Sequence, residues 1–267
     1  MGADIKQLRT RIKSVDSTLH LTKAMGLVAS SKIRRATESM NRGKQYSAAL
    51  SETAQQLATF EECAKSPYMA QRKDGKICLV VVAGDRGLAG GYNANIFRLM
   101  REYSDAKVIP IGKRACERYG EKIVLAEGFS YSDAKDMAYT VCRQFADGEF
   151  DKFGIVCTKY HSLMSQEAYV KWVLPLEKPK DKQSVGAIFE PDEITVLNAI
   201  IPEYVAGMIV SCVKESFASE VAARRVAMDS AGKNAQEMID RLGLEYNRAR
   251  QGAITQEITE IVAGSGL

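Results

Sequence analysis

The sequence predicts a mixed α+β and α/β protein: a long antiparallel two-helix coiled coil, formed by the N- and C-terminal segments, with an inserted Rossmann-like α/β domain. Three observations carry this prediction. Apolar and small residues recur at alternating steps of three and four at both ends of the chain, proline is absent before Pro67, and the middle holds short β-branched runs. The predicted domains are residues 1–66, 67–202 and 203–267.

The N-terminal segment carries a seam of small and apolar residues typical of a coiled coil. One helix of about fifty residues would be about 75 Å long. The middle of the seam has only small side chains, which indicates either a weak stretch of coil or a place where something packs tightly. The seam positions are Ile5, Leu8, Ile12, Val15, Leu19, Thr22, Gly26, Ala29, Ile33, Ala36, Met40, Gly43, Ser47, Leu50, Ala54 and Leu57.

The C-terminal segment repeats the pattern after Pro202 and contains no further proline. It predicts a second helix of about sixty residues, about 90 Å long. Neither helix could bury its stripe alone, so the two are expected to wind around each other antiparallel. The stripe comprises Ile209, Val213, Phe217, Val221, Met228, Ala231, Ala235, Met238, Leu242, Tyr246, Ala249, Ile254, Ile258 and Ile261.

Between the helices the chain is typical of a compact α/β domain. Strands are expected at Lys76–Ala83, Lys107–Ile111 and Phe153–Thr158, in a small parallel or mixed sheet. A helix capped by Ser132 or Asp133 is expected to end near Gly148.

Composition excludes several classes of protein. The chain is 46% hydrophobic and 26% charged, which is usual for a globular protein. Its apolar runs are short, so no membrane span is expected, and the N-terminus has no signal-like core. Six cysteines lack C-x-x-C spacing, so we expect buried reduced thiols rather than zinc or disulfides, and no metal or cofactor.

Charge is concentrated at the N-terminus. Residues 1–44 hold ten lysines and arginines against three acidic residues, a net charge of +7. Such a segment suits an acidic protein surface, an anionic membrane face or nucleic acid, and it is also compatible with a solvated helix face. Because residues 1–45 contain no aromatic side chain to stack on bases, nucleic acid is the least favoured partner.

A glycine-rich loop, Gly84–Asn93 (GDRGLAGGYN), follows the first predicted strand, where nucleotides often bind. Its spacing matches neither G-x-G-x-x-G nor the phosphate loop, and no lysine is placed to reach a phosphate. A structural turn or a surface that docks another subunit is favoured. Since no catalytic triad, metal motif or carboxylate pair is visible either, the chain is not expected to be an enzyme by itself.

Three motifs give the chain a specific resemblance. Arg11–Ala36 reads RIKSVDSTLHLTKAMGLVASSKIRRA, Ala222–Ala231 reads AARRVAMDSA, and YNRARQ and ITQEI occupy 246–251 and 254–258. Together with Gly84–Asn93 they resemble the gamma subunit of bacterial F-type ATP synthase along essentially the whole chain. The resemblance implies a non-catalytic rotor that turns inside a ring of three alpha and three beta subunits. It also implies contacts with epsilon and the c-ring, ATP chemistry on beta, and a peripheral place on the cytoplasmic face of the bacterial plasma membrane.

The resemblance also implies contact residues. Those toward the alpha and beta hexamer are Arg250, Gln251, Thr255 and Glu257, with Thr22, Lys23, Ala24 and Met25 facing an acidic loop of beta and Arg34 and Arg35 extending that basic surface. Ile254, Ile258, Ile261 and Val262 would meet an apolar sleeve of the ring. Contacts toward epsilon and the c-ring are expected at Gly84, Asp85, Arg86, Gly87 and Asn93.

The chain departs from the family pattern at Gly232, usually Thr, and at Gly252, usually Ala, and each glycine is expected to loosen its helix by about 0.5–1 kcal/mol. Ala89 and His20 stand where Cys and Lys are common. Two other functions stay open from the residues alone: a nucleotide-binding enzyme built on the α/β insertion, and a basic coiled-coil adaptor.

Overall fold

The computed structural model describes residues 2–72, 75–178 and 189–264. The chain divides into two compact units. The helix-pair unit comprises the described residues of Met1–Ser30 and Arg224–Leu267, and the sheet unit comprises those of Ser31–Ala223. The three-domain division at 66/67 and 202/203 stays a prediction.

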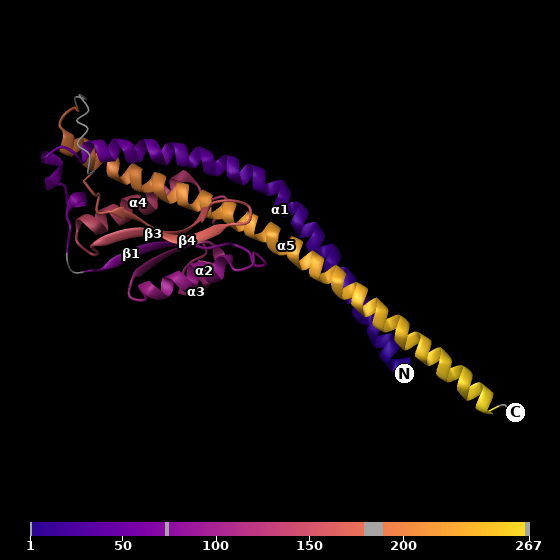
Figure 1. The fold of residues 1–267 in the computed structure, drawn as a ribbon. Coiled ribbons are helices and arrows are strands. Elements are labelled where there is room, and N and C mark those ends of the chain that lie inside the picture. The colour runs from indigo at the N-terminus through magenta and orange to yellow at the C-terminus, as the bar shows by residue number, and fades with distance from the viewer. Residues whose placement is uncertain (1, 73–74, 179–188, 265–267) are drawn as a thin grey trace. The chain divides into compact units, whose positions relative to one another are not determined.

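The sheet unit contains a four-stranded sheet of order β2-β1-β3-β4, labelled in Figure 1. β1 (Ile77–Val82) lies between β2 (Lys107–Ile111) and β3 (Lys152–Tyr160) and is parallel to both. These are the three predicted strands. β4 (Gln166–Leu174), which the sequence analysis missed, pairs antiparallel with β3.

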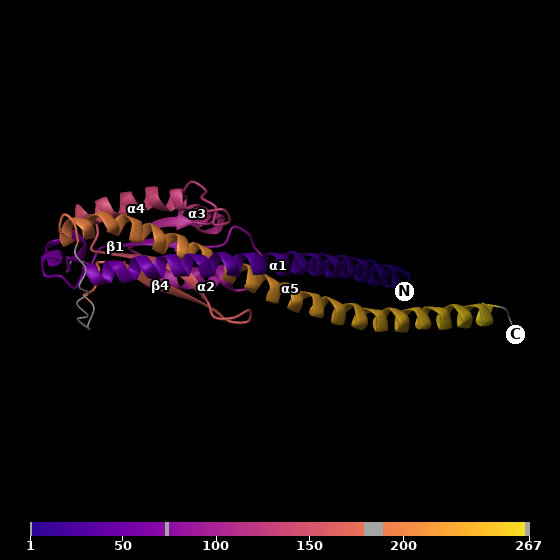
Figure 2. The same cartoon turned by 90° about the horizontal axis from the view of Figure 1, so that it is seen from above.

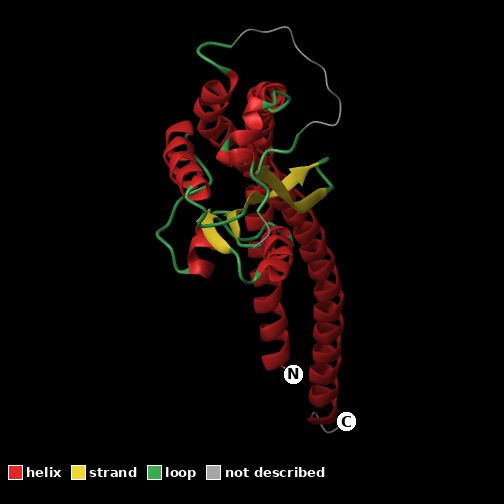
Figure 3. Ribbon diagram, turned by 90° about the vertical axis from the view of Figure 1, so that its left-hand side faces the viewer, coloured by secondary structure: helices red, strands yellow, loops and turns green. Residues whose placement is uncertain are grey.

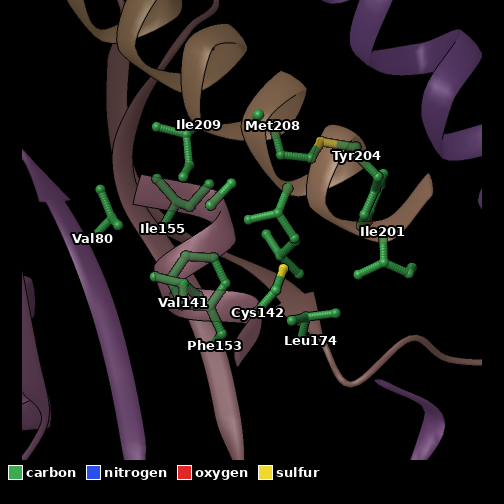
Figure 4. Packing of buried hydrophobic residues seen from close by; sticks show 14 of the residues in the cluster. Val80, Val141, Cys142, Phe153, Ile155, Leu174, Ile201, Tyr204, Met208 and Ile209 are labelled. Atoms are coloured by element: carbon green, nitrogen blue, oxygen red, sulfur yellow. The ribbon is translucent and has the colours of Figure 1, made fainter. Parts of the chain in front are cut away.

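Helices cover both faces of this sheet, as the red and yellow elements in Figure 3 show. Alternate residues of β1 face opposite ways: Val80 joins the core built with α4 and α5, and Leu79 joins the core built with α2. Figure 4 shows the first core. The shorter helices are α2 (Tyr92–Leu99), α3 (Lys113–Tyr119), α4 (Tyr131–Ala146) and the 3₁₀ turns Glu62–Lys65, Pro67–Met69 and Met100–Tyr103.

The cap of α4 differs from the expectation. Ser130, rather than Ser132 or Asp133, is the N-cap, and Asp133 returns a hydrogen bond to Ser130 as the third helical residue. This reciprocal pair is a capping box, which satisfies two backbone N–H groups at once.

The two long helices are α1 (Gly2–Leu57) and α5 (Glu193–Gly264), and every predicted seam position of α1 is buried or half-buried. In the sheet unit Gly43 lies against Lys214 and Ser211, while Gly207 lies against Leu50. Positions rising along α1 therefore meet positions falling along α5, which confirms antiparallel pairing, and Figures 1 and 2 show the two helices side by side there. Gly232 beside Thr22 and Leu19 gives the same direction in the helix-pair unit.

α5 begins ten residues before the predicted start and contains Pro202 in its interior. Proline there removes the hydrogen bond to the carbonyl of Asn198, a loss that usually ends a helix. Here Leu197, Ile201 and Val205 are fully buried on either side of it, so packing against the sheet unit keeps the helix intact.

α5 also holds an 18-residue window with a mean hydropathy of 1.7, long and apolar enough to cross a membrane by composition. This differs from the expectation that no stretch would approach that level. Because 72% of the window is buried inside the protein, the hydropathy is that of a core helix. All six cysteines are free and buried, as expected.

Candidate functional site

The end of α5 extends past the end of its partner helix. Residues that face each other in the helix-pair unit have numbers that sum to about 254, as Gly26 with Met228 and Thr22 with Gly232 do. The described part of α1 begins at Gly2, so by this spacing it offers α5 no partner positions beyond about residue 252. Thr255 and Glu257 lie past this point, Arg250 and Gln251 lie just before it, and all four are exposed.

The apolar stripe continues along this tail without cover. Ile254, Ile258 and Ile261 are 47%, 57% and 65% exposed, although the sequence placed them in the helix seam. The described part of α1 ends before it could cover these three side chains, and they are exposed. A row of exposed isoleucines at steps of four and three is typical of a protein-binding face.

Polar side chains of the tail bond mainly within their own helix. Thr255 donates to the Gln251 carbonyl oxygen at 2.9 Å, and Gln256 donates to Glu260 at 2.8 Å. Over the described residues, the side chains of Arg250, Gln251 and Glu257 make no hydrogen bond or ion pair, so they are available to a partner.

The second predicted set lies on α1 in the helix-pair unit. Lys23 and Ala24 are exposed and Met25 is half-buried, whereas Thr22 is 7% exposed and donates to the Leu19 carbonyl oxygen at 2.9 Å. Thr22 therefore belongs to the seam, and its hydroxyl is already bonded within α1. The other three residues present the outer face of the helix.

Gly26 lies in the middle of the seam, where the side chains are small, and is buried. The Arg225 guanidinium lies across it, donating to the Gly26 carbonyl oxygen at 3.0 Å and pairing with Asp229 at 2.9 Å. A β-carbon at Gly26 would lie 3.5 Å from Arg225. That distance is ordinary van der Waals contact, so Gly26 itself does not distinguish a tightly packed place from a weak stretch of coil.

Arg34 and Arg35 lie on α1 in the sheet unit, and both are exposed. Arg34 pairs with Glu38 one turn along, an exposed pair worth less than about 1 kcal/mol. Arg35 lines a groove of about 340 Å³ together with Lys32 and Lys214. Phe129, Phe217 and Val213 make the wall of the groove apolar.

Glu127 connects this groove to the glycine-rich loop. Its carboxylate accepts from Lys32 of α1 at 2.5 Å and from Arg86 of the loop at 3.5 Å. The structure therefore brings Arg86 beside the basic face of α1, two sets that the sequence analysis treated separately. Only the folded chain shows the link, because Glu127 is about 95 residues from Lys32 and carries no motif.

The loop itself is held from within the sheet unit. Asp85 accepts backbone hydrogen bonds from Lys113 at 3.0 Å, Ala126 at 2.9 Å and Glu127 at 2.7 Å. Gly84 donates to the Asn93 side chain at 2.9 Å and is buried against Glu220. These residues build a structural turn, one of the two readings that the sequence favoured.

Arg86 and Leu88 form the outer surface of the loop, while Gly87 is half-buried. Leu88 is 62% exposed and has φ of 60°, a conformation that costs a branched side chain about 1 kcal/mol or more. An apolar side chain held exposed at this cost is typical of a contact surface.

Two cysteine thiols of the sheet unit, Cys78 and Cys142, are buried. Burial raises the pKa of the Cys78 thiol to about 11 and that of Cys142 to about 12, so both stay protonated. Within the described ranges, no group of three or more His, Cys, Asp or Glu side chains could hold a metal ion.

Comparison with known proteins gives one consistent family. A family model described as ATP synthase matches residues 4–266. Curated relatives called ATP synthase gamma chain include those of Ruminococcus albus, 40% identical over 98% of both chains, and Geotalea daltonii, 36% identical over the same share. A gamma chain of Acetobacterium woodii called sodium ion specific is 35% identical over 99% of both chains.

Solved structures agree in fold. A chain in the OSCP/F1/c-ring of the Euglena gracilis mitochondrial ATP synthase superposes with a TM-score of 0.69 at 18% identity, covering 100% of this chain and 97% of that one. A chain in the central stalk and c-ring of the Tetrahymena thermophila mitochondrial ATP synthase gives 0.60 at 20% identity, covering 79% and 99%.

Proposed function

This chain belongs to the gamma-chain family of ATP synthases, and from that membership we propose how its surfaces serve the complex. A gamma chain is the non-catalytic central-stalk rotor subunit of the F1 sector. Its partners are the alpha and beta subunits, the epsilon subunit and the c-ring, and it is a peripheral part of a membrane-bound complex. Rotation couples ion flow through the membrane sector to ATP synthesis, and hydrolysis reverses it.

One observation carries the physical argument: the helix pair is a single antiparallel pair. Such a pair has no threefold axis, so inside a ring of three alpha and three beta subunits it presents a different face to each neighbour. Three otherwise equal sites become unequal, and rotation exchanges their affinities by differential contact. The chain needs no chemistry of its own for this.

The tail of α5 is the proposed contact with the hexamer. Arg250, Gln251 and Glu257 have exposed side chains that can bond to surrounding loops, and Thr255 adds a hydroxyl. The exposed isoleucines beside them would meet an apolar sleeve. Apolar contact has no directional preference, so a sleeve of this kind would let the tail turn.

The basic face of α1 is the proposed contact with an acidic loop of beta. Lys23 and Met25 lie on the helix-pair unit, and Arg34 and Arg35 on the sheet unit. Thr22 would act indirectly, by setting the seam beneath Lys23. Opposite charge steers such an encounter and weakens with salt.

The glycine-rich loop is the proposed contact with epsilon and the c-ring. Gly84, Asp85 and Asn93 would shape the loop, and Arg86, Gly87 and Leu88 would make the contact. A Leu88→Cys variant cross-linked in the assembled complex tests this assignment. Cross-links to epsilon or c support it, and cross-links confined to alpha or beta contradict it.

We further place the protein at the cytoplasmic face of a bacterial plasma membrane. The support is that the curated relatives are bacterial. Membrane vesicles separated by orientation, and probed with an antibody to this chain, test the side.

Reconstitution with alpha and beta tests the rotor function. ATP hydrolysis is expected to reach its full rate only with all three chains present, and a fully active hydrolase from alpha and beta alone would count against the proposal. Replacing Arg250 and Gln251 together by Ala is expected to impair assembly or turnover while the isolated chain stays helical. Lys233→Ala with Asn234→Ala, also exposed on α5, is the matched control.

The two alternatives make different predictions. Saturable heat on titrating the isolated chain with ATP, ADP or NAD would favour a nucleotide-binding enzyme. Steeply salt-dependent binding to DNA would favour a nucleic-acid adaptor.

A further inference from the structure

Among the residues that the structure describes, the end of β3 has one edge that no other strand covers. β3 pairs with β1 only as far as Val156, opposite Val81, but β3 itself continues to Tyr160. On its other side β4 remains paired through Tyr160. The last residues of β3, from Cys157 to Tyr160, therefore have backbone N–H and C=O groups on the side of α5 that need hydrogen-bond partners.

Side chains of α5 supply those partners. The Thr158 amide donates to Ser216 Oγ at 3.0 Å, the Ser219 hydroxyl donates to the Thr158 carbonyl oxygen at 3.2 Å, and the Tyr160 amide donates to Glu215 Oε1 at 3.1 Å. Amide 158, carbonyl 158 and amide 160 are successive groups on one edge of a strand. The helix thus bonds to the sheet as a neighbouring strand would.

Glu215, Ser216 and Ser219, which we call the α5 clasp, are buried, with exposed fractions of 6%, 1% and 0%. Lys44 of α1 pairs with Glu215 at 2.7 Å, and the Tyr92 hydroxyl of α2 donates to the Ser216 carbonyl oxygen at 3.0 Å. Away from water, bonds of this kind are costly to leave unmade. Helix, sheet and two further helices are therefore joined at one place.

The geometry of the clasp resists rotation of α5 about its own axis. Residues 215, 216 and 219 are spread over about 100° of the helix surface. Because a serine hydroxyl lies about 4.5 Å from the axis, a turn of about 20° would move it about 1.5 Å and break a 3 Å bond. Hydrogen bonds add an angular restraint to that of side-chain packing, because each has a preferred direction.

We propose that Glu215, Ser216 and Ser219 are positioning residues that fix the rotational angle of α5 against the sheet, so that torque on the sheet unit enters α5 without slip. The proposal rests on the rotor function. α5 is one continuous helix from Glu193 to Gly264, so an angle fixed at the clasp is passed along its length.

Hydrogen exchange in the complex reconstituted with alpha and beta tests the bonds. Ser216→Ala is expected to speed exchange of the Thr158 amide by about 2- to 10-fold, the factor for one ordinary hydrogen bond, with little change elsewhere in β3. Glu215→Gln keeps an acceptor and should leave the Tyr160 amide protected, whereas Glu215→Ala should expose it. Unchanged exchange at both amides in the Ala variants would overturn the proposal.

Single-molecule rotation tests the mechanical role. With the hexamer fixed and a bead attached through Met164→Cys, at an exposed turn of the sheet unit, the stalled complex reports angular slack. The double variant Ser216→Ala, Ser219→Ala is expected to broaden the angular distribution and lower the ATP made per turn. Val221→Ala, a buried change on the same helix outside the clasp, should lower thermal stability without broadening it.

Two results would contradict the proposal: a distribution as narrow as wild type in the double variant, or equal broadening by Val221→Ala. The wild-type complex separates this test from that of the rotor function. If the wild-type bead does not rotate with ATP, the function itself fails. If it rotates and the double variant is as stiff, only the clasp fails.

Discussion

Asp85 offers a direct test of whether the glycine-rich loop is held from within. Its carboxylate accepts three backbone hydrogen bonds, at 3.0, 2.9 and 2.7 Å, from two segments distant in sequence. A hydrogen bond to a charged group contributes about 1.5 kcal/mol or more, so three would contribute about 4.5 kcal/mol. Because Asp85 is half-buried and water can replace part of each bond, Asp85→Ala is expected to lower the free energy of unfolding by about 2–4 kcal/mol.

The variant Asp85→Asn separates the contributions of the two carboxylate oxygens to this loss of stability. The amide oxygen can replace Oδ1, which accepts from Lys113 and Ala126, but the amide nitrogen cannot accept from Glu127 as Oδ2 does. The variant is therefore expected to lose about half as much as Asp85→Ala. Arg86→Ala, the exposed neighbour, should change stability by less than about 1 kcal/mol.

Urea unfolding followed by fluorescence measures these differences. Trp172 is the single tryptophan and lies in β4, so the signal reports on the sheet unit. Stability of Asp85→Ala within about 0.5 kcal/mol of wild type would refute the reasoning. If that variant also failed to join epsilon, Asp85 would be a contact residue and not a structural tie.

Three further predictions follow from single sites. Gly252→Ala should raise the helicity of the tail by circular dichroism and stabilise it by up to about 1 kcal/mol, because nothing lies within 4 Å of the added carbon; unchanged helicity would contradict this. Hydrogen bonds from Lys135 and then Tyr131 lower the pKa of the half-buried Glu203, so this group's small contribution to stability should be complete above its unfolded pKa and be lost as pH falls through the lower folded value. Titration of Glu203→Gln beside wild type checks it, and identical acid unfolding profiles would count against it. Cys78 and Cys142 should resist maleimide at pH 8 in the native chain and react after unfolding, since burial keeps both protonated; rapid labelling of the native chain would show that the core is open.

Much of the fold was predictable because local periodicity reports it. The seam of α1 depends on which residues recur at three and four, and packing against one partner helix demands that spacing. The three parallel strands were visible because burial on both faces makes each an apolar run. β4 was missed because it lies at the edge, where exposed Glu167 and Trp172 interrupt any such run.

The errors at α5 have a different origin. Pro202 is a sound local signal for a helix end, and only the buried residues around it outweigh that signal. The stripe through Ile261 was correctly read as apolar, but its cover depends on where α1 begins in the pairing. Neither the continuation of α5 through Pro202 nor the exposure of its last isoleucines can be predicted from the local sequence, because each depends on how a distant part of the chain packs against α5.

The candidate surfaces divide in the same way. The exposed tail residues that we propose as contacts were predicted from the motif they belong to, whereas the Glu127 link and the ties of Asp85 join segments about 28 to 95 residues apart and leave no local pattern. The sequence analysis placed Thr22 both in the seam, from its spacing, and among the contacts, from the resemblance, and its burial agrees with the seam. A helix presents only some of a motif's residues outward, and the partner helix decides which.

The polar groups of α5 are used in two opposite ways, and the difference suits a rotor. Near Ser216 they bond outward, to a sheet edge and to other helices, which fixes an angle because hydrogen bonds have direction. In the tail, Thr255 and Thr259 bond back to carbonyl groups of their own helix and leave isoleucines facing outward. A rotor helix must keep a fixed angle where torque enters it, and it must turn with little resistance where it would contact the surrounding subunits. Exchanging these patterns, by adding outward hydrogen-bonding side chains at Ile258 and Ile261, should therefore slow rotation even where assembly is kept.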